Sequence, residues 1–145
     1  MTLEIEVIGV DPGRHDGLNE TEVEQLCVLS LASAGIEDGH LAVEFVEEPR
    51  MRELNGEHRG ADKPTDVLSF PVDEDGVAAG PRELGDVVIC APYASDLREV
   101  VIHGVLHLTG MDHETDGGEM LALQAELMRW IRRPGERERV REPDR

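Results

Sequence analysis

The first half of the chain alternates between strand-like and helix-like patterns of apolar residues. Residues 3–8 alternate apolar and polar side chains, which predicts a β-strand. Apolar residues then recur at helical spacing over residues 23–34. Asn19 and Glu22 form a capping-box pattern before this run and Gly35 follows it, so we expect a helix between them. Residues 41–46 predict a second strand from their apolar and β-branched content, and residues 49–57 predict a short helix.

The second half predicts two short strands followed by two helices. Residues 67–70 and 87–90 have strand-like composition and are separated by a polar connection over residues 73–82. Residues 97–108 are apolar nearly all round, which predicts a core helix that ends at Gly110. A last helix is expected over residues 118–131, with Met120 and Leu127 on its apolar stripe. The charged residues 132–145 are expected to be a disordered tail.

These elements predict one α+β domain over residues 1–131, with a small mixed β-sheet packed with helices. The chain has 145 residues, enough for one hydrophobic core. It contains no apolar run of membrane-spanning length and no signal-peptide pattern, so we expect a cytoplasmic protein without a membrane partner. Cys27 and Cys90 lie in apolar runs and are expected to be buried free thiols.

The charge of the chain argues against a partner rich in phosphate. The formal net charge is -18, and residues 129–145 contain seven of the fourteen Lys and Arg residues. Proteins that bind nucleic acid usually present a basic surface. Charge alone therefore disfavours a nucleic-acid partner, and only a specific motif can reverse that conclusion.

Three histidines provide such a motif. His103 and His107 are four residues apart on the predicted core helix, so both imidazoles project from one face. Gly110 can end the helix with a positive φ, which allows His113 to turn back toward the same point. Three imidazoles with one open position are typical of a catalytic zinc site with one ion per chain, although copper and nickel accept the same ligands.

The residue after the first histidine decides between two kinds of metalloprotein. Metzincin proteases share this histidine spacing but carry a glutamate general base after the first histidine. Gly104 occupies that position here, so we do not expect a protease of that type. Met120 is expected to be a core residue rather than a methionine placed beneath the metal.

Three segments resemble the YbeY family of endoribonucleases, also described as 16S rRNA maturation factors. They are His103-Gly-Val-Leu-His-Leu-Thr-Gly-Met-Asp-His113, the run Asp62–Pro71 with Leu54-Asn55 and Arg59-Gly60 before it, and Leu84–Cys90. The resemblance implies a zincin-like metal-binding helix and a cleft between that helix and a sheet edge. It also implies a single-strand-specific endoribonuclease of 16S rRNA 3′-end maturation and ribosome quality control. The implied partners are the small ribosomal subunit and an assembly GTPase, and DNA is not expected.

Roles for individual residues follow from this resemblance and from their chemistry. Arg59 matches the family's functional arginine, and its planar fork suits phosphate. Lys63 adds a second charge for substrate, and His107 is expected to take part in catalysis as well as in metal binding. Asp112 is expected either to orient a ligand imidazole or to cap the turn before His113.

Two departures from the family keep other functions open. The segment between Cys90 and His103 is short for the family. The second departure is the strongly acidic surface, which leaves Arg59, Lys63, Arg98 and the tail as the basic residues near any RNA path. We therefore expect weak affinity for naked RNA. The main alternative is a ribosome-assembly factor whose zinc is structural or vestigial, which Gly104 favours. A metal hydrolase of small molecules or peptides is the third hypothesis.

Overall fold

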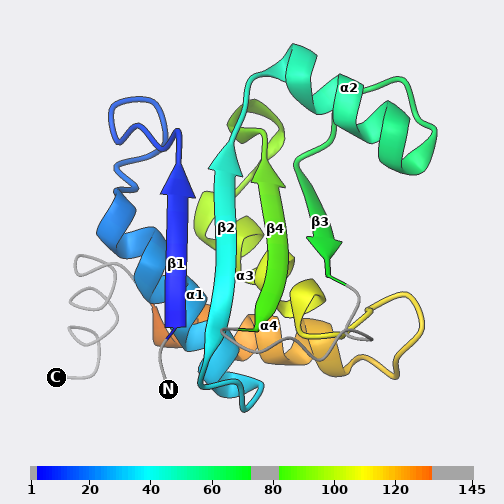
Figure 1. Ribbon diagram of the computed structural model, residues 1–145. Coiled ribbons are helices and arrows are strands. Elements are labelled where there is room, and N and C mark those ends of the chain that lie inside the picture. Colours follow the sequence, from blue (N-terminus) through cyan, green and yellow to red (C-terminus); the bar gives the residue numbers. More distant parts are fainter. Residues whose placement is uncertain (1–2, 73–81, 132–145) are drawn as a thin grey trace, which may run out of the picture.

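The computed structural model describes residues 3–72 and 82–131, which form a four-stranded sheet with helices around it (Figure 1). The tail predicted at residues 132–145 and most of the connection predicted at 73–82 lie outside these ranges. In chain order the elements are β1 (Leu3–Ile8), α1 (Glu20–Ser33), β2 (Gly39–Phe45), α2 (Glu48–Arg59), β3 (Val67–Pro71), β4 (Glu83–Ile89), the 3₁₀ turn η1 (Ala91–Tyr93), α3 (Leu97–Leu108) and α4 (Glu119–Trp130).

The sheet is mixed, with the strand order β1-β2-β4-β3. β1, β2 and β4 are parallel neighbours, and β3 pairs antiparallel with β4 at the edge. A parallel pair needs a crossover, and α1 provides it between β1 and β2. The α+β fold class and the mixed sheet that the sequence predicted are confirmed.

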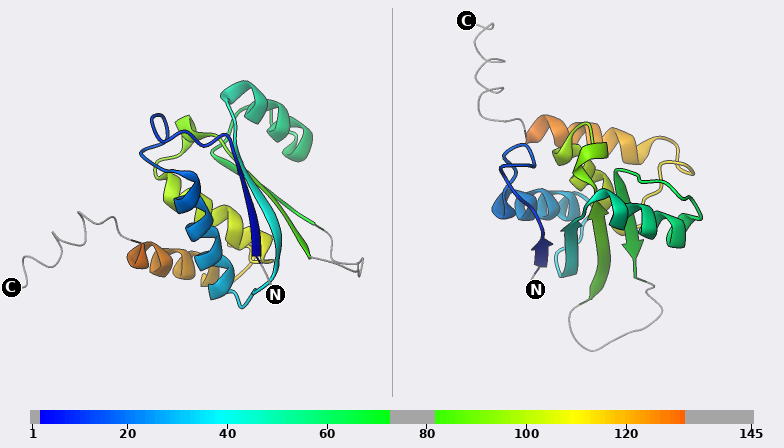
Figure 2. Two further views of the ribbon diagram at one scale, coloured as in Figure 1. Left: turned by 60° about the vertical axis from the view of Figure 1, so that its left-hand side comes forward. Right: turned by 90° about the horizontal axis from the view of Figure 1, so that it is seen from above.

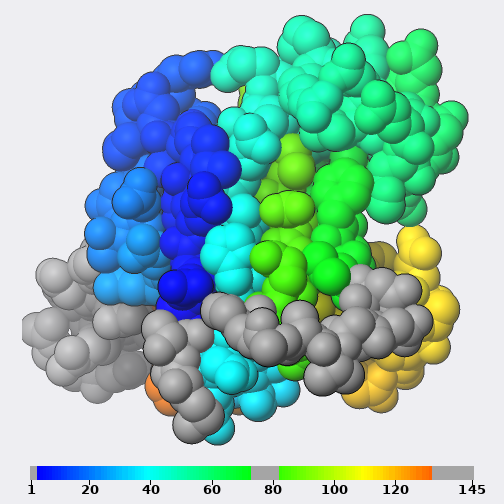
Figure 3. Space-filling view, viewed as in Figure 1, coloured from blue at the N-terminus to red at the C-terminus, as the bar shows by residue number. Residues whose placement is uncertain are grey.

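Helices α1 and α3 cover one face of the sheet, α4 packs on α3 on that same side, and α2 lies over one end of the other face (Figure 2). Alternation in β1 turns Leu3, Ile5 and Val7 toward the main core, and it turns the two glutamates and Ile8 to the exposed face. The main core joins α1, α3, α4 and this sheet face. A smaller cluster of Met51, Leu68, Val88 and Cys90 anchors α2 on the opposite face. Figure 3 shows α2 standing above the exposed strands on that side.

Most boundaries agree with the sequence prediction, and two differ for clear reasons. α2 continues to Arg59, two residues beyond the predicted end, and stops where Gly60 adopts a φ of 72°. β4 begins at Glu83, four residues early, because parallel pairing with β2 extends it through Gly85. On its other side β4 pairs with β3, where a Cβ at Gly85 would lie 2.3 Å from the Phe70 carbonyl oxygen, so only glycine fits at this position between the two strands.

The cysteine and core predictions are confirmed. Cys27 and Cys90 are buried free thiols, and burial raises the pKa of Cys27 to about 12. Met120 is fully buried in the main core. Among the helices of residues 3–72 and 82–131, none is both long and apolar enough to cross a membrane.

Candidate metal centre

The three predicted imidazoles converge at the end of α3. Asp96 caps the start of this helix, accepting hydrogen bonds from the backbone N–H groups of residues 98 and 99. His103 and His107 then lie one turn apart, with ring centroids separated by 4.8 Å. Gly110 has a φ of 101°, which turns the chain back and brings His113 beside both rings. One ligand atom from each of the three lies within 4.8 Å of the others, so the group could hold one metal ion.

Hydrogen bonds on the far side of two rings determine which nitrogen faces the centre. His103 Nδ1 lies 2.8 Å from Gln124 Oε1 on α4, and His107 Nδ1 lies 3.0 Å from the Met111 carbonyl oxygen. Both oxygens accept, so each Nδ1 carries the proton and each Nε2 keeps its lone pair. This is the ring orientation that metal-binding histidines require.

Gln124 is not among the site residues that the sequence predicts. It lies four residues after Met120, where the apolar stripe of α4 would continue with another apolar residue. A polar residue at this position of the stripe was the one sign in the sequence that Gln124 contacts another polar side chain.

The surroundings of His107 favour its neutral form. Burial lowers its pKa, and the neighbouring His103 lowers it further, against a smaller opposing effect of the Met111 carbonyl. A neutral imidazole is the form that binds a metal. The donor set, its ring orientation and its protonation therefore fit a transition-metal ion such as zinc.

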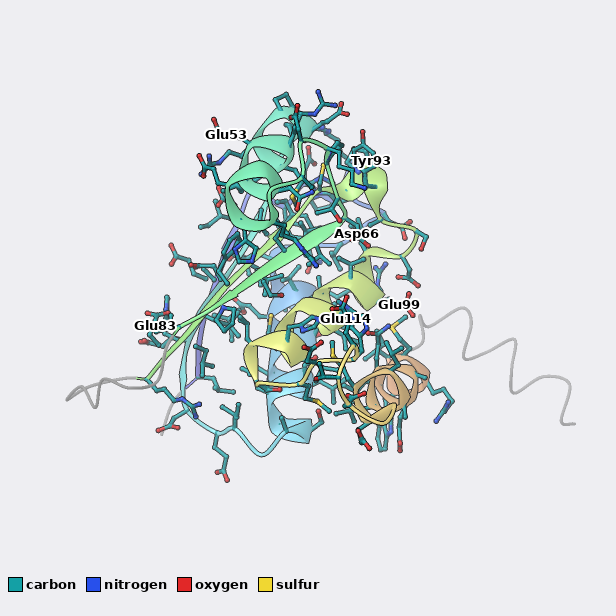
Figure 4. The ribbon with its side chains drawn as sticks, turned by 90° about the vertical axis from the view of Figure 1, so that its right-hand side faces the viewer. Glu53, Asp66, Glu83, Tyr93, Glu99 and Glu114 are labelled. Carbon is teal, nitrogen blue, oxygen red and sulfur yellow. The ribbon has the colours of Figure 1, made fainter. Side chains whose placement is uncertain are left out.

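The three histidines line a cleft of about 480 Å³ between α3 and the β3 edge. This confirms the cleft that the family resemblance implied. The end of α2 and the loop after α3 flank that edge of the sheet in Figure 3. Asp66 and Glu114 come from the loops before β3 and after α3, and both lie on the side of the molecule shown in Figure 4. The other lining residues are His58, Arg59, Thr65, Val67, Leu68, Ser69, Pro71, Gly110, Met111 and Asp112.

Of the three basic residues expected near RNA in the described part of the chain, one lines the cleft, one lies outside its lining and one is buried. Arg59 lines the cleft with the three histidines. Lys63 is not in the lining; its carbonyl oxygen accepts a hydrogen bond from the buried Asn55 side chain, which holds the loop after α2. The expectation that Arg98 lies near an RNA path is wrong. Its side chain is buried and binds Glu22 through two nitrogens at 2.6 and 3.0 Å, because α1 packs on α3 there.

The structure shows what surrounds Asp112 and Gly104, the two residues whose roles the sequence left open. Asp112 Oδ1 accepts the Glu114 backbone N–H at 3.0 Å, so its side chain caps the turn that carries His113. Gly104 faces the sheet, where a Cβ would lie 2.5 Å from Val87 Cγ1. A glutamate at position 104 would therefore collide with β4, which explains why the protease pattern is absent.

The sequence of the chain is similar to that of known proteins. The family model described as endoribonuclease YbeY matches residues 16–132. A protein named endoribonuclease YbeY from Geobacillus thermodenitrificans is 35% identical, covering 88% of this chain and 96% of the relative. Its namesake from Rubrobacter xylanophilus is 38% identical, covering 83% and 98%. A solution structure of a Thermotoga maritima protein aligns with a TM-score of 0.47 and 28% identity over 84% of this chain and 85% of that one.

Proposed function

Because the chain belongs to the endoribonuclease YbeY family, we propose that it is a zinc-dependent endoribonuclease that cleaves single-stranded RNA. We assign its work to rRNA processing at the 3′ end of 16S rRNA and to ribosome quality control. The small ribosomal subunit and an assembly GTPase are the partners that this role requires. The observation that carries the proposal is the convergence of three imidazoles and one arginine in a single cleft.

His103, His107 and His113 would hold the metal, one ion per chain. A bound zinc ion supplies activation of water near neutral pH and polarisation of a phosphoryl oxygen. The protein's part is to orient the rings: the contacts of Gln124 with His103 and of the Met111 carbonyl with His107 hold Nδ1 of each ring and leave Nε2 as the metal ligand.

Arg59 and the carboxylates of the cleft supply the remaining groups. The Arg59 guanidinium, at the end of α2, is suited to bind the phosphate of a strand lying in the cleft. Asp66 and Glu114 line the same cavity, so either carboxylate would be a candidate proton acceptor in place of a glutamate at position 104. This weakens the reason for which Gly104 favoured a vestigial site. Lys63, outside the lining, would contact RNA that extends beyond the cleft.

The acidity of the protein sets the strength of RNA binding. With a net charge of -18 and Arg98 engaged in ion pairs, few cations are left to attract phosphates. Affinity for isolated RNA should be weak, and the ribosomal subunit would supply the additional contacts in the cell. The same acidity favours the second candidate function, an assembly factor that binds basic ribosomal proteins and uses zinc structurally.

One experiment separates these two functions. Zinc-loaded parent protein, His107→Ala and Arg59→Ala are incubated with single-stranded RNA and with a duplex of the same sequence. We expect the parent to cut the single strand, with activity abolished in His107→Ala and reduced mainly through KM in Arg59→Ala. A zinc-loaded parent that binds pre-30S particles but leaves both RNAs intact would establish the assembly-factor function instead.

A further inference from the structure

A fourth imidazole lies in the cleft, outside the candidate metal centre. His58 is on the last turn of α2, one residue before Arg59, and its exposed side chain lines the cavity. Its ring contacts the ring of Phe70 on β3, with centroids 4.5 Å apart and planes tilted by 57°. Phe70 packs in turn against the cluster that anchors α2 to the sheet. The His58 ring is therefore supported on one side and open to the cleft on the other.

The other large aromatic rings of the protein lie elsewhere. The chain has two Phe, one Tyr and one Trp, and all four are in the described ranges. Phe45 is buried and stacks on His15, Tyr93 donates a hydrogen bond to Glu48, and Trp130 is at the end of α4. None of the four is in the cleft lining. His58 is the ring in that lining that is left free when the three convergent imidazoles bind a metal.

We propose that His58 stacks against an unpaired base of the RNA while Arg59 binds an adjacent phosphate; this inference rests on the proposed function. Bases within a duplex are stacked on one another, so an exposed ring recognises only a base that is splayed out of a single strand. Such a contact would select single-stranded RNA without reading its sequence. It also supplies affinity that does not depend on positive charge, which is an advantage for a protein with a net charge of -18.

The test measures binding directly, with zinc-loaded protein at low ionic strength. Short single-stranded RNAs carrying the fluorescent base 2-aminopurine at successive positions are titrated with the parent, His58→Ala and His58→Phe. His40→Ala is the matched control, because it removes an imidazole from the far end of the opposite sheet face. Thermal melting of each variant checks that the fold is intact, which the exposure of His58 leads us to expect.

We expect His58→Ala to raise Kd by about 5- to 150-fold and to abolish the quenching of one 2-aminopurine position. His58→Phe keeps a stacking ring and should restore both signals, and His40→Ala should match the parent. Unchanged affinity and quenching in His58→Ala would overturn the inference. So would a loss in His58→Ala that the Phe variant fails to restore, since that pattern indicates hydrogen bonding rather than stacking.

A second measurement changes the RNA instead of the protein. An RNA with one abasic nucleotide at the quenched position should bind with the same loss as His58→Ala shows on intact RNA. If quenching depends on His58 but the parent cleaves no RNA, the nuclease proposal is refuted and the stacking contact stands. If the parent cleaves RNA at a rate that neither His58→Ala nor the abasic nucleotide changes, the stacking proposal is refuted and the nuclease proposal stands.

Discussion

Removing the hydrogen-bond acceptor behind His103 should weaken metal binding without disturbing the fold. In Gln124→Leu the 2.8 Å contact between His103 Nδ1 and Gln124 Oε1 is lost, while leucine suits the half-buried stripe of α4. A net hydrogen bond contributes about 1 kcal/mol, and holding one side chain in a single rotamer contributes roughly another 0.5–1.5 kcal/mol. The sum corresponds to a loss of about 10- to 100-fold in zinc affinity, the range known for partners of this kind.

The assay is competition for zinc between the protein and a chelating dye near neutral pH. Gln124→Glu keeps an acceptor oxygen and should retain the parent's affinity or exceed it. Glu126→Gln, on an exposed position of the same helix, changes the charge of α4 by one unit away from the site and should behave as the parent. Parent-like zinc affinity in Gln124→Leu, beside a His107→Ala variant that binds none, would refute the reasoning that the ring contact orients the ligand.

Three further predictions concern packing, RNA binding and pH. Gly104→Ala places a Cβ against the sheet and should lower the free energy of unfolding by about 1–2 kcal/mol, because overpacking outweighs the better helix propensity of alanine. A free energy of unfolding equal to the parent's in urea denaturation would contradict this. The slope of log K for single-stranded RNA against log salt should fall by about 0.7 in each of Arg59→Gln and Lys63→Gln, and an unchanged slope would remove that residue from the RNA path. Glu83 raises the pKa of His40 by hydrogen bonding, so the contact stabilises the fold below about pH 6.5 and is lost as pH rises through the raised pKa. The parent should therefore exceed His40→Gln in stability near pH 5.5 but not near pH 9 in urea titrations, and a pH-independent difference would disprove the assignment.

Local patterns were enough to predict most of the fold and the centre of the site. Helical periodicity is a property of adjacent turns, so the bounds of α3 and the shared face of His103 and His107 could be read from spacing alone. The same holds for the cap at Asn19, whose side chain accepts the Glu22 N–H as the capping pattern predicted. Gly110 indicated the turn that returns His113, because few other residues adopt its φ.

Contacts between elements required the tertiary structure, since no periodicity along the chain encodes them. The sequence left Arg98 among the basic residues expected near an RNA path, but the packing of α1 on α3 buries its side chain against Glu22. Packing also pairs Gln124 with His103 across two helices, and sets His58 on Phe70 across a helix and a strand. Local sequence thus determined which side chains share a helix face. The way in which the helices and the sheet pack determined which of them meet, and with that the shape of the cleft.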